Sequence, residues 1–337
     1  MTDSAALAMR TLALRQTASP RVRELVRGAI VDAYQRDGAV CIRGLLSPGE
    51  VDTLRAGIEA NLAHPSPRAK VASRSDDPGL FIEDFCCWQD NPNYQRTIFE
   101  TPLAQTAARL MRSRTARLYH DHMLTKEPGT RQPTPWHQDQ PYYNVEGFQN
   151  CSMWIPVDPV AQHSTLEFVA ASHRGPWLMP RSFMDRLAKW FPEGSLADLP
   201  DVDAQRDRHR ILGWELAPGD VVCFHMLALH AAGAVDAGRR RRVFSLRFIG
   251  DDVRHAPRRW TTSPQFPGLA EQLAAGAPMD HALFPLLWGV SNQSGARPTQ
   301  ASHPGARRDP GGDSPKVDTG LRRYDETATR VGARRRS

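Results

Sequence analysis

The sequence predicts a mainly β fold, a sandwich or barrel with helices flanking it. Between about residues 117 and 250, short strand-like runs alternate with turns rich in Gly, Pro and Asp, which is typical of such folds. Amphipathic helical patterns precede this region. The chain has 337 residues, of which 40% are hydrophobic, so it can bury a large core. A wholly disordered chain, a collagen-like fibre and a small disulfide-stapled protein are therefore excluded.

Helices are expected ahead of the strand-rich region. Apolar residues at helical spacing predict the first over about 20–35. The second begins at Pro48, because Ser47 and Glu50 have the spacing of a capping box with proline at the first helical position. A third amphipathic pattern covers about 102–111.

Each predicted strand is a short apolar run bounded by turn residues. The runs are 39–46, 117–125, 137–143, 151–157, 165–169, 211–216, 221–225 and 243–249. Turn signals such as Pro218-Gly219-Asp220 separate them. No repeat of about 20–50 residues is visible, which argues against a solenoid or a propeller.

Composition divides the chain into one folded domain and two extensions. Residues 1–18 read as a flexible leader, and 19–290 as the domain. Within the domain, the long and partly helical stretch 174–210 interrupts the strands, which favours an inserted lid. Residues 291–337 are rich in Gly, Pro and Arg and poor in large apolar residues, which predicts a disordered basic tail.

Charge and cysteine content narrow the choice of partners and location. The formal net charge is +6, and the 291–337 tail alone holds ten Lys/Arg and five Asp/Glu, so the rest of the chain is nearly neutral. Such a body gives no electrostatic basis for nucleic-acid binding. No run approaches the roughly 18 apolar residues of a membrane span. The five cysteines lack zinc or CxxC spacing and no secretory signal is visible, so we expect a reduced, cytoplasmic protein.

The segment Trp136-His137-Gln138-Asp139 holds a candidate metal motif. On a strand, residues two apart point to the same face, so His137 and Asp139 can reach one centre. A distant second histidine would complete a two-His, one-carboxylate face, which leaves open positions on an octahedral metal and suits Fe(II) oxygen chemistry. A His-x-Asp pair alone also occurs by chance. The candidates for the third ligand are His163, His173, His209, His225, His230 and His255.

Further motifs accompany this pair along the chain. They are Gln140-Pro141-Tyr142, Leu166-Glu167-Phe168-Val169, Ser172-His173-Arg174, Pro218-Gly219-Asp220-Val221-Val222, and Phe224-His225 with Leu229-His230, followed by an arginine run and Ser245. Together with the His-x-Asp segment they resemble the phytanoyl-CoA dioxygenase family of Fe(II)/2-oxoglutarate-dependent oxygenases. The resemblance covers roughly residues 22–288.

The resemblance implies a double-stranded β-helix, which is a jelly-roll or cupin-like barrel. It implies iron ligands at His137, Asp139 and His230, with His225 as the competing candidate for the third. The family places this ligand in a Leu-His step, which favours His230. The resemblance also implies Fe(II), 2-oxoglutarate and O2 as cofactor and cosubstrates.

In the family, an arginine eleven residues after the last ligand binds the distal carboxylate of 2-oxoglutarate, which corresponds to Arg241. A planar guanidinium pairs well with a carboxylate. Arg241 lies within the run 239–242, so its presence alone says little. Strand parity places Arg241, Ser245 and Arg247 on one face, which would line the barrel, and Arg247 stays an alternative.

Two more residues are candidate contacts of the cosubstrate. Trp154 lies near a family tryptophan at the cosubstrate, and Lys126 lies in the segment Lys126-Glu127-Pro128-Gly129. Core packing is the alternative for Trp154, and a solvated turn is the alternative for Lys126. The Ser172-His173-Arg174 motif is interpreted as a structural loop.

The resemblance implies hydroxylation of an unactivated carbon of a small organic metabolite, a natural-product intermediate being one option, with release of succinate and CO2. Related halogenating enzymes have a small residue in place of Asp139, so hydroxylation is favoured here. The aromatic residues near the motif that can line a substrate pocket are Phe85, Trp88, Tyr142 and Tyr143. Two alternatives stay open: a cupin-type metalloenzyme that does not use 2-oxoglutarate, and a non-catalytic ligand-binding barrel.

Overall fold

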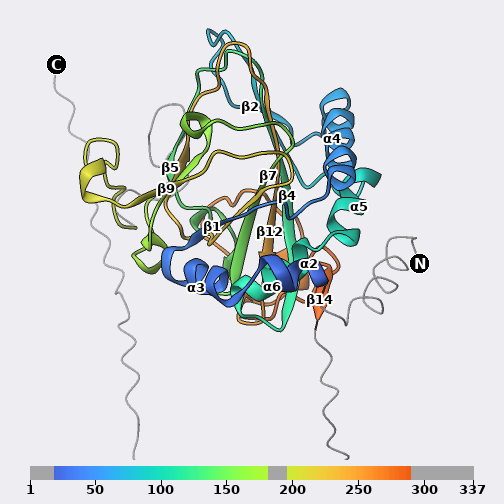
Figure 1. Cartoon of the computed structure of the whole chain (residues 1–337). Coiled ribbons are helices and arrows are strands. Elements are labelled where there is room, and N and C mark those ends of the chain that lie inside the picture. Colours follow the sequence, from blue (N-terminus) through green and yellow to red (C-terminus); the bar gives the residue numbers. More distant parts are fainter. Residues whose placement is uncertain (1–18, 181–195, 290–337) are drawn as a thin grey trace, which may run out of the picture. The chain divides into compact units, whose positions relative to one another are not determined.

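Antiparallel sheets dominate the described part of the chain, which confirms the prediction of a mainly β fold with flanking helices (Figure 1). The computed structural model describes residues 19–180 and 196–289. All of these residues belong to one unit of the chain, Met1–Ser291.

The strands described are β1 (Ala39–Ile42), β2 (Lys70–Val71), β3 (Phe81–Phe85), β4 (Thr115–Lys126), β5 (Thr134–His137), β6 (Val145–Glu146), β7 (Asn150–Pro156), β8 (Leu166–Val169), β9 (Ile211–Gly213), β10 (Val221–Phe224), β11 (His230–Ala232), β12 (Arg241–Ile249), β13 (Arg254–His255) and β14 (Leu286–Gly289). The larger sheet has the order β1-β10-β7-β12-β4-β3-β2, and β14 also pairs with β4. The smaller sheet has the order β5-β11-β8-β9, and β13 pairs with β6.

The helices described are α2 (Pro20–Leu25), α3 (Gly28–Asp37), α4 (Pro48–Ala63), α5 (Pro92–Glu100), α6 (Leu103–Met111) and α7 (Leu269–Gln272). Short 3-10 helices are η1 (Gln140–Tyr142), η2 (Gln162–Ser164), η3 (Ser172–Arg174) and η4 (Arg206–Arg208). The prediction of one helix over 20–35 is wrong. The chain leaves helical geometry at Val26, Arg27 is extended, and a second helix begins at Gly28, a residue that weakens helix interiors.

The capping box predicted at the start of α4 is present. The Ser47 hydroxyl accepts a hydrogen bond from the Glu50 amide, and the Glu50 carboxylate accepts one from the Ser47 amide at 2.7 Å. Arg21 adds an ion pair to the same carboxylate at 2.6 Å. These contacts fix the first turn of the helix that lies along the larger sheet (Figure 1).

One face of the larger sheet packs against the helices. Alternate residues of β12, namely Phe244, Leu246 and Phe248, are fully buried and join one apolar cluster with side chains of α4, α5 and α6. Phe244 also stacks on Tyr94 of α5 with ring centroids 4.1 Å apart. Because side chains alternate along a strand, the intervening residues of β12 face the other side, toward the smaller sheet and the cavity between the two.

Several predictions fall on residues outside the described part of the chain. These are the leader 1–18, the tail 291–337 and the middle of the proposed lid, 181–195. The domain boundaries stay predictions. Among the described helices, none is long and apolar enough to cross a membrane.

The packing predicts a large difference between two identical substitutions. Leu246 is fully buried between the sheet and the helices, whereas Leu80 has 38% of its surface exposed. Leu246→Ala is expected to lower the free energy of unfolding by about 2–5 kcal/mol, since it removes buried methyl groups and leaves a cavity. Leu80→Ala is expected to change it by less than about 1 kcal/mol. Urea unfolding of both variants measures the difference, and equal losses would contradict this description of the core.

Candidate metal centre

Three side chains that the sequence marks as metal ligands converge in the structure. Ligand atoms of His137, Asp139 and His230 lie within 4.8 Å of one another, and all three residues are buried. Oδ1 of Asp139 is 3.7 Å from Nε2 of His137 and 3.8 Å from Nε2 of His230. Two imidazoles and one carboxylate on one side of a point can hold a divalent metal while leaving positions open for other ligands.

Strand pairing brings the two histidines together. His230 opens β11 and lies directly opposite His137, the last residue of β5, across the antiparallel ladder. The two ring centroids are 4.2 Å apart. The register of the smaller sheet thus joins residues that are 93 positions apart in the sequence.

Asp139 reaches the centre by a different route from the one predicted. The prediction of a strand over 137–143 is wrong, because β5 ends at His137 and Asp139 has helical backbone angles at the start of η1. The Asp139 amide donates to the Met226 carbonyl at 2.8 Å, and the Gln138 side chain donates to the Leu227 carbonyl at 2.9 Å. These bonds tie the turn to the loop that precedes His230.

Backbone carbonyls orient both imidazoles. Nδ1 of His137 lies 2.8 Å from the Pro135 carbonyl, and Nδ1 of His230 lies 2.8 Å from the Ala228 carbonyl. A carbonyl oxygen only accepts hydrogen bonds, so Nδ1 carries the hydrogen in both rings and Nε2 presents its lone pair to the centre. Burial, followed by the neighbouring His137, lowers the pKa of His230 to about 3, so its ring is neutral at physiological pH.

The second oxygen of Asp139 is held by two donors. Oδ2 accepts hydrogen bonds from the Ser152 hydroxyl at 3.0 Å and from Nη2 of Arg247 at 3.2 Å, which leaves Oδ1 for a metal. Although burial alone would raise the pKa of Asp139, the Arg247 guanidinium and the two imidazoles hold it well below the usual range. The carboxylate is therefore ionised, as a metal ligand must be.

The competing ligand candidate, His225, serves another purpose. Its Nδ1 accepts a hydrogen bond from the Leu227 amide at 3.0 Å, and its Nε2 lies 2.8 Å from the Phe148 carbonyl. Both ring nitrogens are thus engaged with backbone groups. The Ser172-His173-Arg174 loop packs nearby, and the Ser172 hydroxyl accepts from the Leu229 amide at 2.8 Å, directly before His230. This contact agrees with a structural role for that loop.

The three candidate ligands line a cavity of about 400 Å³ between the two sheets. Its walls include apolar side chains of both sheets, such as Leu124, Leu166, Phe224 and Val243. Of the aromatic residues proposed for a pocket, Phe85, Tyr142 and Tyr143 line the cavity, and Trp88 is instead buried in the cluster under the helices.

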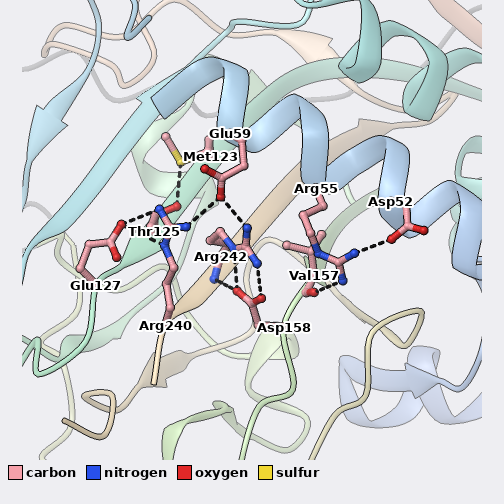
Figure 2. A network of polar contacts seen from close by, with 10 residues as sticks. All are labelled: Asp52, Arg55, Glu59, Met123, Thr125, Glu127, Val157, Asp158, Arg240 and Arg242. Atoms are coloured by element: carbon pink, nitrogen blue, oxygen red, sulfur yellow. Dashed lines mark hydrogen bonds and ion pairs between the residues drawn. The ribbon is translucent and has the colours of Figure 1, made fainter. Parts of the chain in front are cut away.

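Alternation of side chains places Arg240 and Arg242 on the side of the chain away from the cavity, and Figure 2 shows these two side chains. Arg240 pairs with Glu127 and Glu59, each at 2.8 Å. Arg242 also reaches Glu59 on α4, and its Nε donates to Asp158 at 2.9 Å. These ion pairs hold the start of β12 against helix α4.

Arg241 points the other way and lines the cavity opposite Lys126, its partner across β12 and β4. Lys126 donates to the carbonyls of Gln132 at 2.6 Å and Gly233 at 3.0 Å, and Arg241 donates to the Ser164 carbonyl. Within the described residues neither cation forms an ion pair with a carboxylate. Burial lowers the pKa of Arg241 to about 10, and burial together with Arg241 lowers the pKa of Lys126 to about 6.

The burial of Lys126 beside Arg241 shows that the alternative of a solvated turn lysine is wrong. It also keeps Lys126 and Trp154 as candidate contacts of the cosubstrate. Lys126 is only 1% exposed, so it does not lie in a solvated turn. Trp154 also lines the cavity, with the Arg241 guanidinium 5.6 Å from its ring centroid. A buried arginine and a buried lysine lie here without an acidic partner among the described residues, and charging both side chains is costly unless an anion binds, so this end of the cavity is suited to an anion.

Sequence reasoning missed other polar residues at the site. The role of Ser152, which donates a hydrogen bond to Asp139, depends on the pairing of β7 with β12 that places it opposite Arg247. Glu83 and His122 were missed for the same reason, since β3 and β4 bring them to the wall. Alternation along the predicted strands is the signal that favours an inward His122, but it does not reveal the neighbour.

Comparisons with a family model and with a curated protein give the same family that the sequence motifs resemble. The phytanoyl-CoA dioxygenase (PhyH) family model matches residues 34–243. A Caenorhabditis elegans protein described as a probable phytanoyl-CoA dioxygenase is 24% identical over 193 residues, which is 55% of this chain and 55% of that protein. The match thus spans about half the length of the curated relative.

Solved structures share the fold at low sequence identity. The carbocyclase SnoK from nogalamycin biosynthesis has a TM-score of 0.61 at 22% identity, covering 78% of this chain and 97% of that one. The epimerase SnoN, in complex with Fe3+, alpha ketoglutarate and nogalamycin RO, has a TM-score of 0.60 at 23% identity, covering 77% and 97%. EctD from S. alaskensis, with 2-oxoglutarate and 5-hydroxyectoine, has 0.54 at 19%, covering 78% and 91%. These similarities confirm the jelly-roll barrel.

The geometry predicts which histidine is needed for metal binding. His137→Ala, Asp139→Ala and His230→Ala are each expected to weaken Co(II) binding by at least about a hundredfold, because each removes a ligand atom. His225→Gln keeps polar atoms near its backbone partners and is expected to bind Co(II) as the parent does. The visible absorption of bound Co(II) during titration measures all four variants. Parent-like binding by His230→Ala together with loss in His225→Gln would contradict the assignment.

Proposed function

Because the chain belongs to the phytanoyl-CoA dioxygenase family, we propose that it is an Fe(II)- and 2-oxoglutarate-dependent dioxygenase. It hydroxylates an unactivated carbon of a small organic metabolite, and converts 2-oxoglutarate and O2 to succinate and CO2. The observation that carries this proposal is the content of one cavity. It holds a two-His, one-carboxylate metal face and, apart from it, a buried arginine and a buried lysine that have no acidic partner among the described residues.

The donor set fits ferrous iron. His137, Asp139 and His230 would hold the metal on one face, and positions opposite remain for exchangeable ligands. When bound, the iron with 2-oxoglutarate and O2 supplies the oxidising power needed to replace a carbon–hydrogen bond with a carbon–hydroxyl bond. The chain's own residues bind, orient and exclude water, and hydrogen abstraction from carbon requires no general base.

The cation pair fits the distal carboxylate of 2-oxoglutarate. Arg241 presents a fork whose charge survives burial, and Lys126 faces it across the strands. A carboxylate placed between them would provide the acidic partner that the described residues lack. Trp154 forms an adjoining wall, and the apolar side chains Leu124 and Val243 separate the cations from His122 and Ser245 along the two strands.

The structural relatives support the same cofactors for this chain. SnoN is described in complex with Fe3+ and alpha ketoglutarate, and EctD with 2-oxoglutarate. Their described activities differ, since SnoK is a carbocyclase and SnoN an epimerase. Hydroxylation is proposed here because of the family and because Asp139 stands where related halogenating enzymes have a small residue. Analysis of the product distinguishes hydroxylation from ring formation and from epimerisation.

Binding of 2-oxoglutarate to the iron-loaded protein tests this function. Anaerobic titration of the Fe(II) protein with 2-oxoglutarate is expected to develop a weak visible charge-transfer band that saturates. Arg241→Met is expected to lower the apparent 2-oxoglutarate affinity at least about tenfold, since a charged hydrogen bond is lost. Iron affinity should stay unchanged. Arg240→Met, the outward-facing neighbour, is the matched control and should bind like the parent.

The possible results separate the alternatives. Tight iron binding without a band, or equal 2-oxoglutarate affinity in Arg241→Met, would point to a cupin-type metalloenzyme that does not use this cosubstrate. Absence of iron binding would point to a ligand-binding barrel without catalysis. A band that is lost in His137→Ala supports the proposed dioxygenase.

Lys126 makes the binding of 2-oxoglutarate depend on protons. Its pKa of about 6 leaves the amine mostly uncharged at pH 7.5 in the free protein. A carboxylate arriving beside it raises that pKa, so we expect uptake of up to one proton per 2-oxoglutarate bound near pH 7.5. The uptake should decline as the pH falls through about 6 and become small near about pH 5, where most of the free lysine is already protonated, and it should be absent in Lys126→Met. Calorimetric titration in two buffers of different ionisation enthalpy measures it, and an identical proton count in parent and variant would refute a carboxylate contact.

A further inference from the structure

The cavity has a second polar end, which lies farther along β12 from Arg241 and Lys126 and beside Asp139. Arg247 lies six residues after Arg241 on the same face of β12, which is about 20 Å of strand. Across the ladder, His120 lies opposite Arg247 and His122 opposite Ser245. Arg247 and His122 line the cavity, whereas His120 lies beside it with its ring edge against Tyr143.

Arg247 uses only part of its guanidinium within the described chain. Nε donates to the Tyr143 hydroxyl at 3.1 Å, and Nη2 donates to Asp139 at 3.2 Å. Nη1 is buried and has no hydrogen-bond partner among the described residues. The residue as a whole is only 6% exposed, so little solvent reaches this nitrogen. A buried charged donor without a partner is costly and indicates that another molecule supplies an acceptor.

His122 offers a second donor at the same end. Its Nε2 is buried without a hydrogen-bond partner in the described residues, and the residue is 8% exposed. The Glu83 carboxylate is 3.6 Å from this nitrogen, beyond hydrogen-bond distance but close enough to favour a hydrogen on it. The ring stacks on Phe85 with centroids 3.9 Å apart, so its orientation is set by packing.

The charge of the cavity favours an anion at this end as well. Four basic side chains line it, Lys70, Lys126, Arg241 and Arg247, against two carboxylates, Glu83 and Asp139. A divalent metal and a doubly charged 2-oxoglutarate cancel each other. Positive charge therefore remains after both have bound, even if Lys126 is counted as neutral.

We propose that Arg247 and His122 form a binding subsite for a carboxylate of the primary substrate, which is thus a small carboxylic acid with an apolar body. The proposal rests on the dioxygenase function above. Nη1 of Arg247 and Nε2 of His122 donate to the carboxylate, and the aromatic side chains of Phe85 and Tyr142 contact the apolar part. Because Arg247 also holds Asp139, the anchor places the substrate beside the metal on the side away from 2-oxoglutarate.

Benzoate is a suitable probe, because it joins a carboxylate to a small apolar ring. The full-length protein is loaded with Mn(II) and 2-oxoglutarate, and the relaxation of benzoate protons by Mn(II) reports binding close to the metal. We expect saturable relaxation for benzoate and at least about tenfold weaker binding for benzyl alcohol, which lacks the charge.

Two variants test the two donors. Arg247→Gln keeps a hydrogen-bond donor for Asp139 but removes the guanidinium, and should weaken benzoate binding at least about tenfold. His122→Leu leaves the Arg247–Asp139 contact in place and should weaken it about fivefold. Arg240→Gln, the same change on the outer side of the strand, should bind benzoate like the parent. Electron paramagnetic resonance of free Mn(II) checks that each variant still holds the metal.

The outcomes separate this proposal from the function on which it rests. If the parent binds Mn(II) but not 2-oxoglutarate, the dioxygenase function fails, and the benzoate titration with Mn(II) alone still tests the subsite. Equal benzoate affinity in the parent, Arg247→Gln and His122→Leu overturns the subsite. So does displacement of benzoate by 2-oxoglutarate, or a loss of 2-oxoglutarate affinity in Arg247→Gln as large as in Arg241→Gln, because Arg247 would then contact the cosubstrate.

Discussion

The pairing of β11 with β5 is the constraint on which the candidate site depends, because it sets His230 opposite His137. A slip of one residue would turn one histidine to the other face of the sheet and remove the centre. The register is held from the other side as well, where His230 pairs with Phe168 of β8 and the two rings stack with centroids 5.7 Å apart. Asp139 follows from the same arrangement, since its amide bonds to the loop that leads into β11.

Burial of charge is the second constraint, and it separates arginines that look alike in the sequence. Arg240 and Arg242 face outward and meet carboxylates of Glu59, Glu127 and Asp158. Their inward neighbour Arg241 meets backbone carbonyls and the ring of Trp154, and no carboxylate among the described residues pairs with it. An uncompensated buried charge costs several kcal/mol, so the ladder and the outer ion pairs must hold β12 in place against this cost. A bound anion would recover part of it, which links ligand binding to the stability of the barrel.

Much of the fold could be predicted because helices and strands depend on how apolar and polar residues are spaced over short stretches of the sequence. Strand parity predicted that Arg241, Ser245 and Arg247 share the face of β12 that lines the barrel, and the Ser47–Glu50 spacing predicted the start of α4. The turn that carries Asp139 could not be predicted, since two residues of spacing suit both a strand and a turn at its end. The burial of Lys126 was also missed, because one of its carbonyl partners, Gln132, lies beyond the turn that follows the strand, and the other, Gly233, is 107 residues away in the sequence.

The walls of the cavity come from strands that hold different positions in the two sheets. His137, His230 and the cation pair rest on β4, β11 and β12, which are each paired on both sides, and on β5, which ends the smaller sheet. The wall with Glu83 and Phe85 comes from β3, and Lys70 comes from β2, the strand that ends the larger sheet next to β3. A strand at the edge has one partner fewer, so its side chains can change with less effect on the ladder. A family that keeps its oxidising chemistry while its members act on different substrates is expected to vary at such an edge. The cavity-lining residues of β2 and β3 are therefore expected to influence which substrate binds, together with the proposed subsite of His122 on β4 and Arg247 on β12.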